Sequence, residues 1–385
     1  MRFSPEGLEP NVAGDWMNEP LNLLPLDAWH RAHGARMVGF AGYEMPVQYE
    51  GIVAEHLWTR RSASLFDVSH MGQLLVTGDL ADRTLETLLP SDLIAIREGR
   101  LRYSLLLNDE GGIIDDLIVT RRPGHFYLVV NGATKLGDID YLRHRLPSLI
   151  VDHVKEQALL ALQGPRAAEA LARIAPGVEG LAFMSGAPFA IGRSQAWISR
   201  SGYSGEDGFE ISLSARSAAD VAGLLAAQPE VRPAGLGARD SLRLEAGLPL
   251  YGHDLDPNTS PVEAGLEFAL SPRRREEGAF PGFARIRQEL DRGPSSRRVG
   301  LAIEGRQPVR EGAFVVDEQG AEIGKVTSGG WSPSLEAPIA MAYVPLARSA
   351  PGTAIALSQR GRTFAARVTT LPFVPHRYHR KDSRP

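Results

Sequence analysis

Hydrophobic residues along the chain follow helical spacing in some segments and strand-like spacing in others. In residues 51–61 the apolar positions recur near helical spacing, and charged residues occupy the other side. Residues 101–107, 113–120 and 125–131 are instead rich in β-branched and aromatic residues, with clusters of Asn, Asp, Gly and Pro between them. These three segments predict an antiparallel meander.

The same two patterns continue through the first 250 residues. Further helices are predicted at 26–33, 81–89, 138–145, 167–174, 218–227 and 238–246. Further strands are predicted at 73–78, 158–163, 196–200 and 208–213. Because helices and antiparallel strands are mixed along the chain, the sequence predicts an α+β fold.

The pattern changes after a charged stretch at 272–277 and a Gly-Pro-Ser-Ser loop at 293–296. From there to Pro372 short strands follow one another, with Gly or Pro in most turns, which predicts a small barrel or a jelly-roll-like domain. At the other end, residues up to about Pro25 include Pro10, Pro20 and Pro25 and show no sustained period. We therefore expect a loosely ordered extension over residues 1–25, an α+β region over 26–292 and a β domain over 297–378.

Composition excludes several classes of function. The 385 residues include 46 acidic and 42 basic residues, a net charge of −4, which argues against a nucleic-acid partner. The chain has no cysteine, so disulfide scaffolds, zinc ribbons and thiolate nucleophiles are excluded. No apolar run approaches the roughly 18–20 residues that span a bilayer, so no membrane is expected. Arg2 is the only Lys or Arg in the acidic first thirty residues, which predicts a cytoplasmic protein.

Acidic residues stand in two segments that otherwise read as strands. Asp115 and Asp116 interrupt an apolar run, and successive strand side chains point to opposite faces, so one carboxylate can face a cleft. A functional site and a sheet edge explain this pair equally well. Glu210 follows the glycine-rich segment 201–208 and alternates with apolar neighbours. A tight surface turn is the alternative interpretation there.

Other polar residues have simpler structural explanations. Arg239, Arg243 and Glu245 cannot all face solvent if the helix at 238–246 packs on the core. His70, which follows a predicted turn, is more often a hydrogen-bonded core histidine than a ligand. Residues 376–379 lie in a basic tail, where a solvated C-terminus is the simpler interpretation.

Seven longer motifs follow one another along the chain. They are FAGYEMPVQY at 40–49, LFDVSHM at 65–71, GGIIDDLIV at 111–119, ALQGP at 161–165, GYSGEDG at 202–208, ARDSLRLEAG at 238–247 and VTSGG at 326–330. Together they closely resemble the aminomethyltransferase (T-protein) family of the glycine cleavage system, over about 26–378. The resemblance implies a three-lobed α+β architecture around a central channel, with two folate-binding lobes and a β-rich C-terminal lobe.

The resemblance also implies an activity. Members of this family accept an aminomethyl group from the dihydrolipoyl arm of the lipoylated H-protein. They pass its carbon to tetrahydrofolate as co-substrate, release ammonia and form 5,10-methylenetetrahydrofolate. No metal and no enzyme thiol are needed, in keeping with a chain that lacks cysteine.

The resemblance also implies roles for individual residues that match the motifs of the family. By resemblance, Asp116 is the catalytic acid and Asp115 its structural partner. Glu210 matches the carboxylate that binds folate, and Arg239 matches a folate-contacting arginine. Tyr378 matches a C-terminal tyrosine that reaches back to the ligand. The remaining expected pocket residues are Met71, Tyr103, Tyr127, Asn131 and Tyr203.

Two alternatives remain within the same superfamily or close to it. A folate-dependent demethylase, or the folate-binding lobe of a sarcosine or dimethylglycine oxidoreductase, would share the two carboxylates but take carbon from another donor. A non-enzymatic folate-binding assembly factor for iron–sulfur proteins would need a cysteine in a short loop, which this chain does not have.

Overall fold

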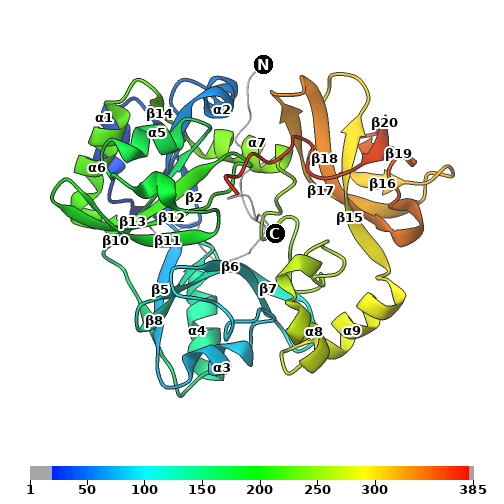
Figure 1. The fold of residues 1–385 in the computed structure, drawn as a ribbon. Helices are drawn as coiled ribbons and strands as arrows, with labels where there is room; N and C mark the ends of the chain where they lie inside the picture. Colours follow the sequence, from blue (N-terminus) through cyan, green and yellow to red (C-terminus); the bar gives the residue numbers. More distant parts are fainter. Residues whose placement is uncertain (1–19, 381–385) are drawn as a thin grey trace.

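The structure is a computed structural model in which residues 20–380 are described. Three lobes surround the centre of the molecule: two α+β lobes and a C-terminal barrel (Figure 1). Each lobe has its own hydrophobic core. The three-lobed α+β architecture expected from the resemblance is thereby confirmed.

The first lobe is built on a six-stranded sheet of order β11-β12-β13-β10-β4-β14. A small sheet of order β1-β3-β2 and the helices named below complete it (Figure 1). Its large strands are β4 (Ala63–Asp67), β10 (Gln157–Gln163), β11 (Ser185–Ile191), β12 (Ser194–Arg200), β13 (Gly208–Ser214) and β14 (Val231–Pro233), and its small strands are β1 (Asn22–Leu23), β2 (Arg36–Phe40) and β3 (Tyr43–Gln48). The helices are α1 (Asp27–Ala32), α2 (Ile52–Arg61), α5 (Ala167–Ala172), α6 (Ala218–Ala226) and α7 (Leu236–Glu245).

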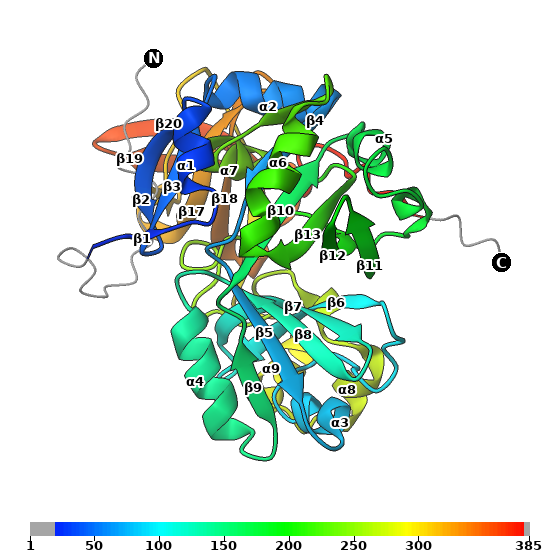
Figure 2. The same ribbon diagram turned by 90° about the vertical axis from the view of Figure 1, so that its left-hand side faces the viewer.

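The second lobe is a five-stranded antiparallel sheet of order β6-β7-β8-β5-β9. Its strands are β5 (Gly72–Thr77), β6 (Leu101–Leu107), β7 (Ile113–Arg122), β8 (His125–Val130) and β9 (Ile150–His153), and its helices are α3 (Ala81–Glu86), α4 (Lys135–Arg145), α8 (Pro272–Glu277) and α9 (Phe283–Arg292). Helix α4 runs beside β9 (Figure 2). The predicted meander is confirmed as β6-β7-β8.

The C-terminal lobe is a closed barrel of order β15-β18-β17-β16-β19-β20. Its strands are β15 (Ser296–Ile303), β16 (Phe314–Val316), β17 (Glu322–Ser332), β18 (Ala337–Pro345), β19 (Ala354–Gln359) and β20 (Arg362–Thr369). Short 3-10 helices occur at Val178–Gly180, Ala215–Ser217, Glu267–Ala269 and Leu346–Arg348. Of the two alternatives for this lobe, the barrel is the one observed.

Several elements differ from the sequence-based expectation. The end of the predicted extension is ordered, because β1 pairs with β3 and Leu24 is buried against Met45; residues 1–19 lie outside the described part. The charged stretch 272–277, for which no helix was predicted, is helix α8. Strand β11 was not predicted because its sequence, SGAPFAI, contains Gly and Pro. Within residues 20–380, no helix is both long and apolar enough to cross a membrane.

Candidate active site

A cavity of about 1030 Å³ lies where the lobes meet. Strands β6 and β7 of the second lobe, β13 and α7 of the first, β15 of the barrel and the C-terminal tail all contribute to its wall. The wall includes these residues singled out from the sequence: Met71, Tyr103, Asp116, Asn131, Tyr203, Glu210, Arg239 and Tyr378. Residues separated by more than 300 positions are therefore brought together around one space.

Tyr127 is the expected pocket residue that the structure does not place at the cavity wall. It shares a face of β8 with Val129, which does reach the wall, but Tyr127 lies two residues earlier in the strand. Its hydroxyl donates to Gln73 Oε1 at 2.6 Å, and the Arg122 guanidinium lies 3.4 Å from its ring centre. Tyr127 thus belongs to the packed interface behind the cavity.

Asp116 is held on β7 by donors from both neighbouring segments. Tyr103 on β6 donates its hydroxyl to one carboxylate oxygen at 3.0 Å, and Asn131 Nδ2 lies 2.8 Å from the other. The preceding Asp115 is fully buried and does not line the cavity. It accepts hydrogen bonds from Asn131 N at 3.1 Å and Nδ2 at 2.8 Å. The structure therefore brings one carboxylate to the cavity and turns the other into the protein.

The electrostatic surroundings of Asp116 favour its neutral form. Burial raises the pKa of its carboxyl group, and the negative charge of Asp115 raises it further. Hydrogen bonds from Tyr103 and Asn131 favour the ionised form but do not outweigh these effects, so the pKa is about 7. A carboxyl group with this pKa exchanges a proton readily near neutral pH, as general acid–base catalysis requires.

A second carboxylate, Glu210, reaches the same cavity from β13. Ser201, directly after β12, donates its hydroxyl to Glu210 Oε2 at 2.7 Å and so orients the carboxylate. Arg239 on α7 is partly buried, and this loss of solvent lowers the pKa of its guanidinium, while the charge of Glu210 acts in the opposite direction. Its guanidinium carbon lies 4.8 Å from the ring centre of Tyr203, which donates its hydroxyl to the Pro249 carbonyl.

The C-terminal tail crosses back to the first lobe instead of extending into solvent. Tyr378 stacks on Phe183, with ring centres 4.2 Å apart and planes 10° from parallel. The Arg377 N–H donates to the Gly205 carbonyl at 2.8 Å, and His376 Nε2 lies 2.9 Å from the Ala246 carbonyl oxygen. The tail remains on the surface, but the interpretation of it as free in solvent is wrong, because the Arg377 backbone, the His376 ring and the Tyr378 ring each contact the rest of the protein.

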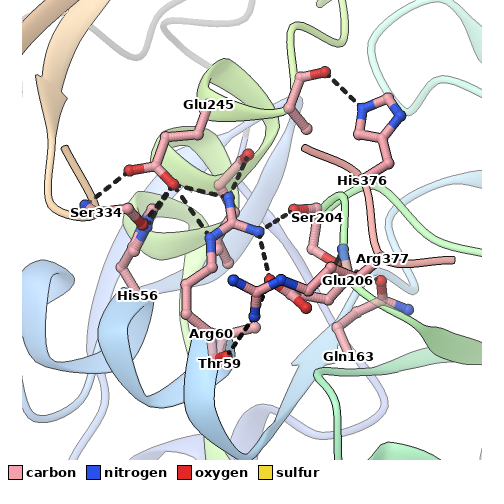
Figure 3. A network of polar contacts seen from close by, with 12 residues as sticks. His56, Thr59, Arg60, Gln163, Ser204, Glu206, Glu245, Ser334, His376 and Arg377 are labelled. Atoms are coloured by element: carbon pink, nitrogen blue, oxygen red, sulfur yellow. Dashed lines mark hydrogen bonds and ion pairs between the residues drawn. The ribbon is translucent and has the colours of Figure 1, made fainter. Parts of the chain in front are cut away.

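A buried polar network holds α7, the helix that carries Arg239 (Figure 3). Arg60 on α2 bonds to Glu245 Oε2 at 2.8 Å and to Glu206 Oε1 at 2.9 Å. His56 Nε2 lies 3.0 Å from Glu245 Oε2, and the barrel's Ser334 donates to the same oxygen at 2.8 Å. Burial alone would raise the pKa of Glu245, but hydrogen bonding from His56 and the charge of Arg60 bring it to about 2. This network joins the first lobe to the barrel.

Ser201 and Phe183 contact predicted site residues, but sequence reasoning assigned no role to either. Ser201 carried a usable signal, because it opens the same glycine-rich segment that leads into Glu210. Phe183 carried none, since its contact with Tyr378 joins segments almost two hundred residues apart. Within residues 20–380, no group of three or more His, Asp or Glu side chains is placed to hold a metal ion.

Comparison with known proteins gives the same architecture. The GCVT N-terminal domain matches residues 26–274, and the glycine cleavage T-protein C-terminal barrel domain matches residues 297–375. The chain is 45% identical over 371 residues to the mitochondrial aminomethyltransferase of Gallus gallus, covering 94% of each chain. For the Homo sapiens mitochondrial enzyme, the identity is 43% over 371 residues, with 94% of this chain and 92% of the human chain covered.

A solved structure agrees with these relatives. The glycine cleavage system aminomethyltransferase T from Bartonella henselae superposes with a TM-score of 0.89 at 44% identity, covering 94% of this chain and 100% of that one. The chain matches both domains of the family, and it aligns with relatives of more than 40% identity over nearly their whole length. The chain belongs to the glycine cleavage T-protein family of aminomethyltransferases.

Proposed function

We propose that this protein transfers the one-carbon unit of an aminomethyl group, carried on the dihydrolipoyl arm of an H-protein, to tetrahydrofolate. The observation that carries the proposal is that two carboxylates of different character, Asp116 and Glu210, face one cavity in a chain of the aminomethyltransferase family. The products would be ammonia, the reduced dithiol and 5,10-methylenetetrahydrofolate.

The residues of the cavity fit a reduced folate. A pterin presents an amino group and a ring N–H side by side, which a carboxylate can accept together. Glu210, already oriented by Ser201, offers such a carboxylate at the wall. Tyr203 and the stacked pair of Tyr378 and Phe183 supply aromatic surface for the flat part of the molecule. A volume of about 1030 Å³ leaves room for a second reactant beside it.

The reaction requires proton movement but no change in oxidation state of the protein. The transferred carbon forms bonds to two folate nitrogens while its bonds to sulfur and to the amine nitrogen break. The two N–H protons of the folate leave on the thiol and on ammonia. Asp116, with a pKa of about 7, would accept a proton beside the folate nitrogens and pass it to a leaving group. Tyr103 and Asn131 keep its carboxylate in place for that exchange.

Positioning supplies the other part of the rate enhancement. Holding two reactants in one cavity from which water is displaced can contribute about 7–11 kcal/mol in favourable cases. The α7 network and the C-terminal tail keep the walls of the cavity fixed to one another. No thiol of the chain is required, since the sulfur belongs to the lipoyl arm of the partner.

The cytoplasmic location of the protein stays a prediction.

One assay tests this function. Purified protein is incubated with lipoylated, aminomethyl-loaded H-protein and tetrahydrofolate, and ammonia release is followed. Release that depends on both substrates supports the proposal. An inactive protein in this assay that instead transfers carbon from a methylated amine donor to tetrahydrofolate would favour the demethylase alternative.

A further inference from the structure

Asp138 is a buried acidic side chain that the reaction above does not use. It lies in the first turn of α4, is 1% exposed and does not line the cavity. Both of its carboxyl oxygens are buried and make no regular hydrogen bond among residues 20–380, and the Thr134 hydroxyl is the one donor close enough to favour its charged form. The adjacent cation, Lys135, is directed elsewhere, with Nζ 2.6 Å from the Tyr43 hydroxyl and 2.8 Å from the His70 carbonyl oxygen. Asp138 is therefore buried without a compensating charge from its own helix.

The neighbour of Asp138 is another carboxyl group. Its side chain is in hydrogen-bonding contact with that of Asp115 on β7. Two buried carboxyl groups in contact cannot both be ionised, so one must carry a proton and donate it to the other. Asp115 already accepts two N–H donors from Asn131, at 3.1 and 2.8 Å, which favours its charged form. The Thr134 hydroxyl acts on both carboxyl groups, but Asp138 has no counterpart of the two Asn131 donors, so the proton belongs on Asp138.

Electrostatics agree with this geometry. Burial and the charge of Asp115 raise the pKa of Asp138 to about 10, so that it stays protonated at neutral pH. The charge of Asp115 is in turn the second cause, after burial, of the raised pKa of Asp116. The other titratable groups facing the three carboxyl groups are Tyr103, Tyr203 and Tyr251, with Asp256 beyond the last of these. Burial raises the pKa of all three tyrosines, so they stay neutral.

We propose that Asp138 is a positioning residue whose protonated carboxyl group donates a hydrogen bond to Asp115 and thereby keeps Asp115 negatively charged beside Asp116. Asp138 touches neither substrate, and it acts on the reaction only through Asp115. The inference rests on the proposed function in one respect, namely that Asp116 works at the reacting centre. The arrangement itself, with Asp138 on α4, Asp115 on β7 and Asp116 at the cavity, does not depend on the proposed function.

The protonation state can be tested without turnover. Infrared difference spectra of the folded protein at pH 9, wild type against variant, detect the carbonyl stretch of a protonated, buried carboxyl group. At this pH Asp116 is ionised and Asp138 is not. We expect the wild type to show this band, Asp138→Asn to lack it, and Asp140→Asn, which removes an exposed carboxylate of the same helix, to keep it. A wild type without the band, or a band that survives in Asp138→Asn, would overturn the proposal.

The effect on the reaction is tested by a pH profile of the three variants Asp138→Ala, Asp138→Asn and Asp140→Asn. Alanine removes the donor, so Asp115 takes up a proton itself and no longer opposes ionisation of Asp116. The pH midpoint of the rate should then fall by about one unit, and the ratio of the rates at pH 6 and pH 8 should rise about fivefold. Asparagine retains an N–H donor, so the midpoint stays in place, as it does in Asp140→Asn.

The outcomes separate this inference from the proposed function. If Asp138→Asn shifts the midpoint as far as Asp138→Ala, or if Asp138→Ala does not shift it, the hydrogen bond to Asp115 is not what Asp138 contributes. If Asp138→Ala does not fold, the infrared band in the wild type and in Asp138→Asn decides. An inactive wild type would refute the proposed function, while the infrared result would still decide where the proton lies.

Discussion

Replacing Asp116 with Asn is the perturbation that bears most directly on the chemistry. Asparagine has nearly the same shape, but it cannot exchange a proton near neutral pH. It has one carbonyl oxygen where aspartate presents two, so either the Tyr103 hydroxyl or Asn131 Nδ2 loses its acceptor. The protein should still fold, because the lost hydrogen bond is worth only about 0.5–1.5 kcal/mol.

The expected loss of activity is much larger than that. General acid–base catalysis by one group contributes roughly 10²–10⁴-fold, which corresponds to about 2.7–5.4 kcal/mol in the activation free energy. We therefore expect kcat of Asp116→Asn to fall by about 10²–10⁴-fold. The dissociation constant for tetrahydrofolate should change by less than about tenfold, since Glu210 and the aromatic wall are intact.

The assay is single-turnover ammonia release with saturating aminomethyl-loaded H-protein, alongside a direct titration of tetrahydrofolate. Tyr103→Phe is the matched control, because it removes one hydrogen bond to Asp116 and leaves the carboxylate. That control should lose only about two- to tenfold in rate. Its pH midpoint should move upward, because the lost bond favoured the ionised form. An Asp116→Asn variant whose kcat stays within tenfold of the wild type would refute the role assigned to this carboxyl group.

Three further predictions concern the binding carboxylate, the pH dependence and the buried network. Glu210→Gln should weaken tetrahydrofolate binding by about 1.5–3 kcal/mol with a small change in the rate at saturation, measured by equilibrium titration; equal affinity would contradict its role. The wild-type rate should fall as the pH decreases through about 7, because Asp116 becomes protonated and can no longer accept a proton; a pH-rate profile that is flat from 6 to 8 would contradict this. Glu245→Ala leaves Arg60 and His56 buried without their acceptor and should lower the free energy of unfolding by about 3–5 kcal/mol, measured by chemical denaturation with Glu50→Ala as an exposed control; equal stability of the two variants would count against the network.

The sequence predicts the elements whose patterns are strong. The meander of the second lobe was predicted because three runs of β-branched and aromatic residues are separated by clear turn clusters. Strands β2 and β3 were not predicted, since their segments contain Gly39 and Pro46 and lack a long alternating run. The tail at 376–379 was misread from composition because its partners, Phe183 and Gly205, are remote in sequence.

The candidate site could be predicted only in part, for a related reason. Alternation along β7 predicts that one of Asp115 and Asp116 is turned toward a cleft, but spacing alone does not identify the cleft. The cavity exists only where three separately folded lobes meet, and its wall draws on residues from Phe40 to Arg380. Resemblance supplied the residue roles, and it also added Tyr127, which the fold places behind the wall. The contact of Asp138 with Asp115 joins a helix to a strand and leaves no periodic signal in the sequence.

A structure of the protein bound to tetrahydrofolate would test the central idea most directly. The pterin amino group and ring N–H should lie within hydrogen-bonding distance of the Glu210 carboxylate, and the folate nitrogens that receive the carbon should lie beside Asp116. A folate bound outside the central cavity, or bound inside it with its reactive nitrogens turned away from Asp116, would contradict the proposed chemistry.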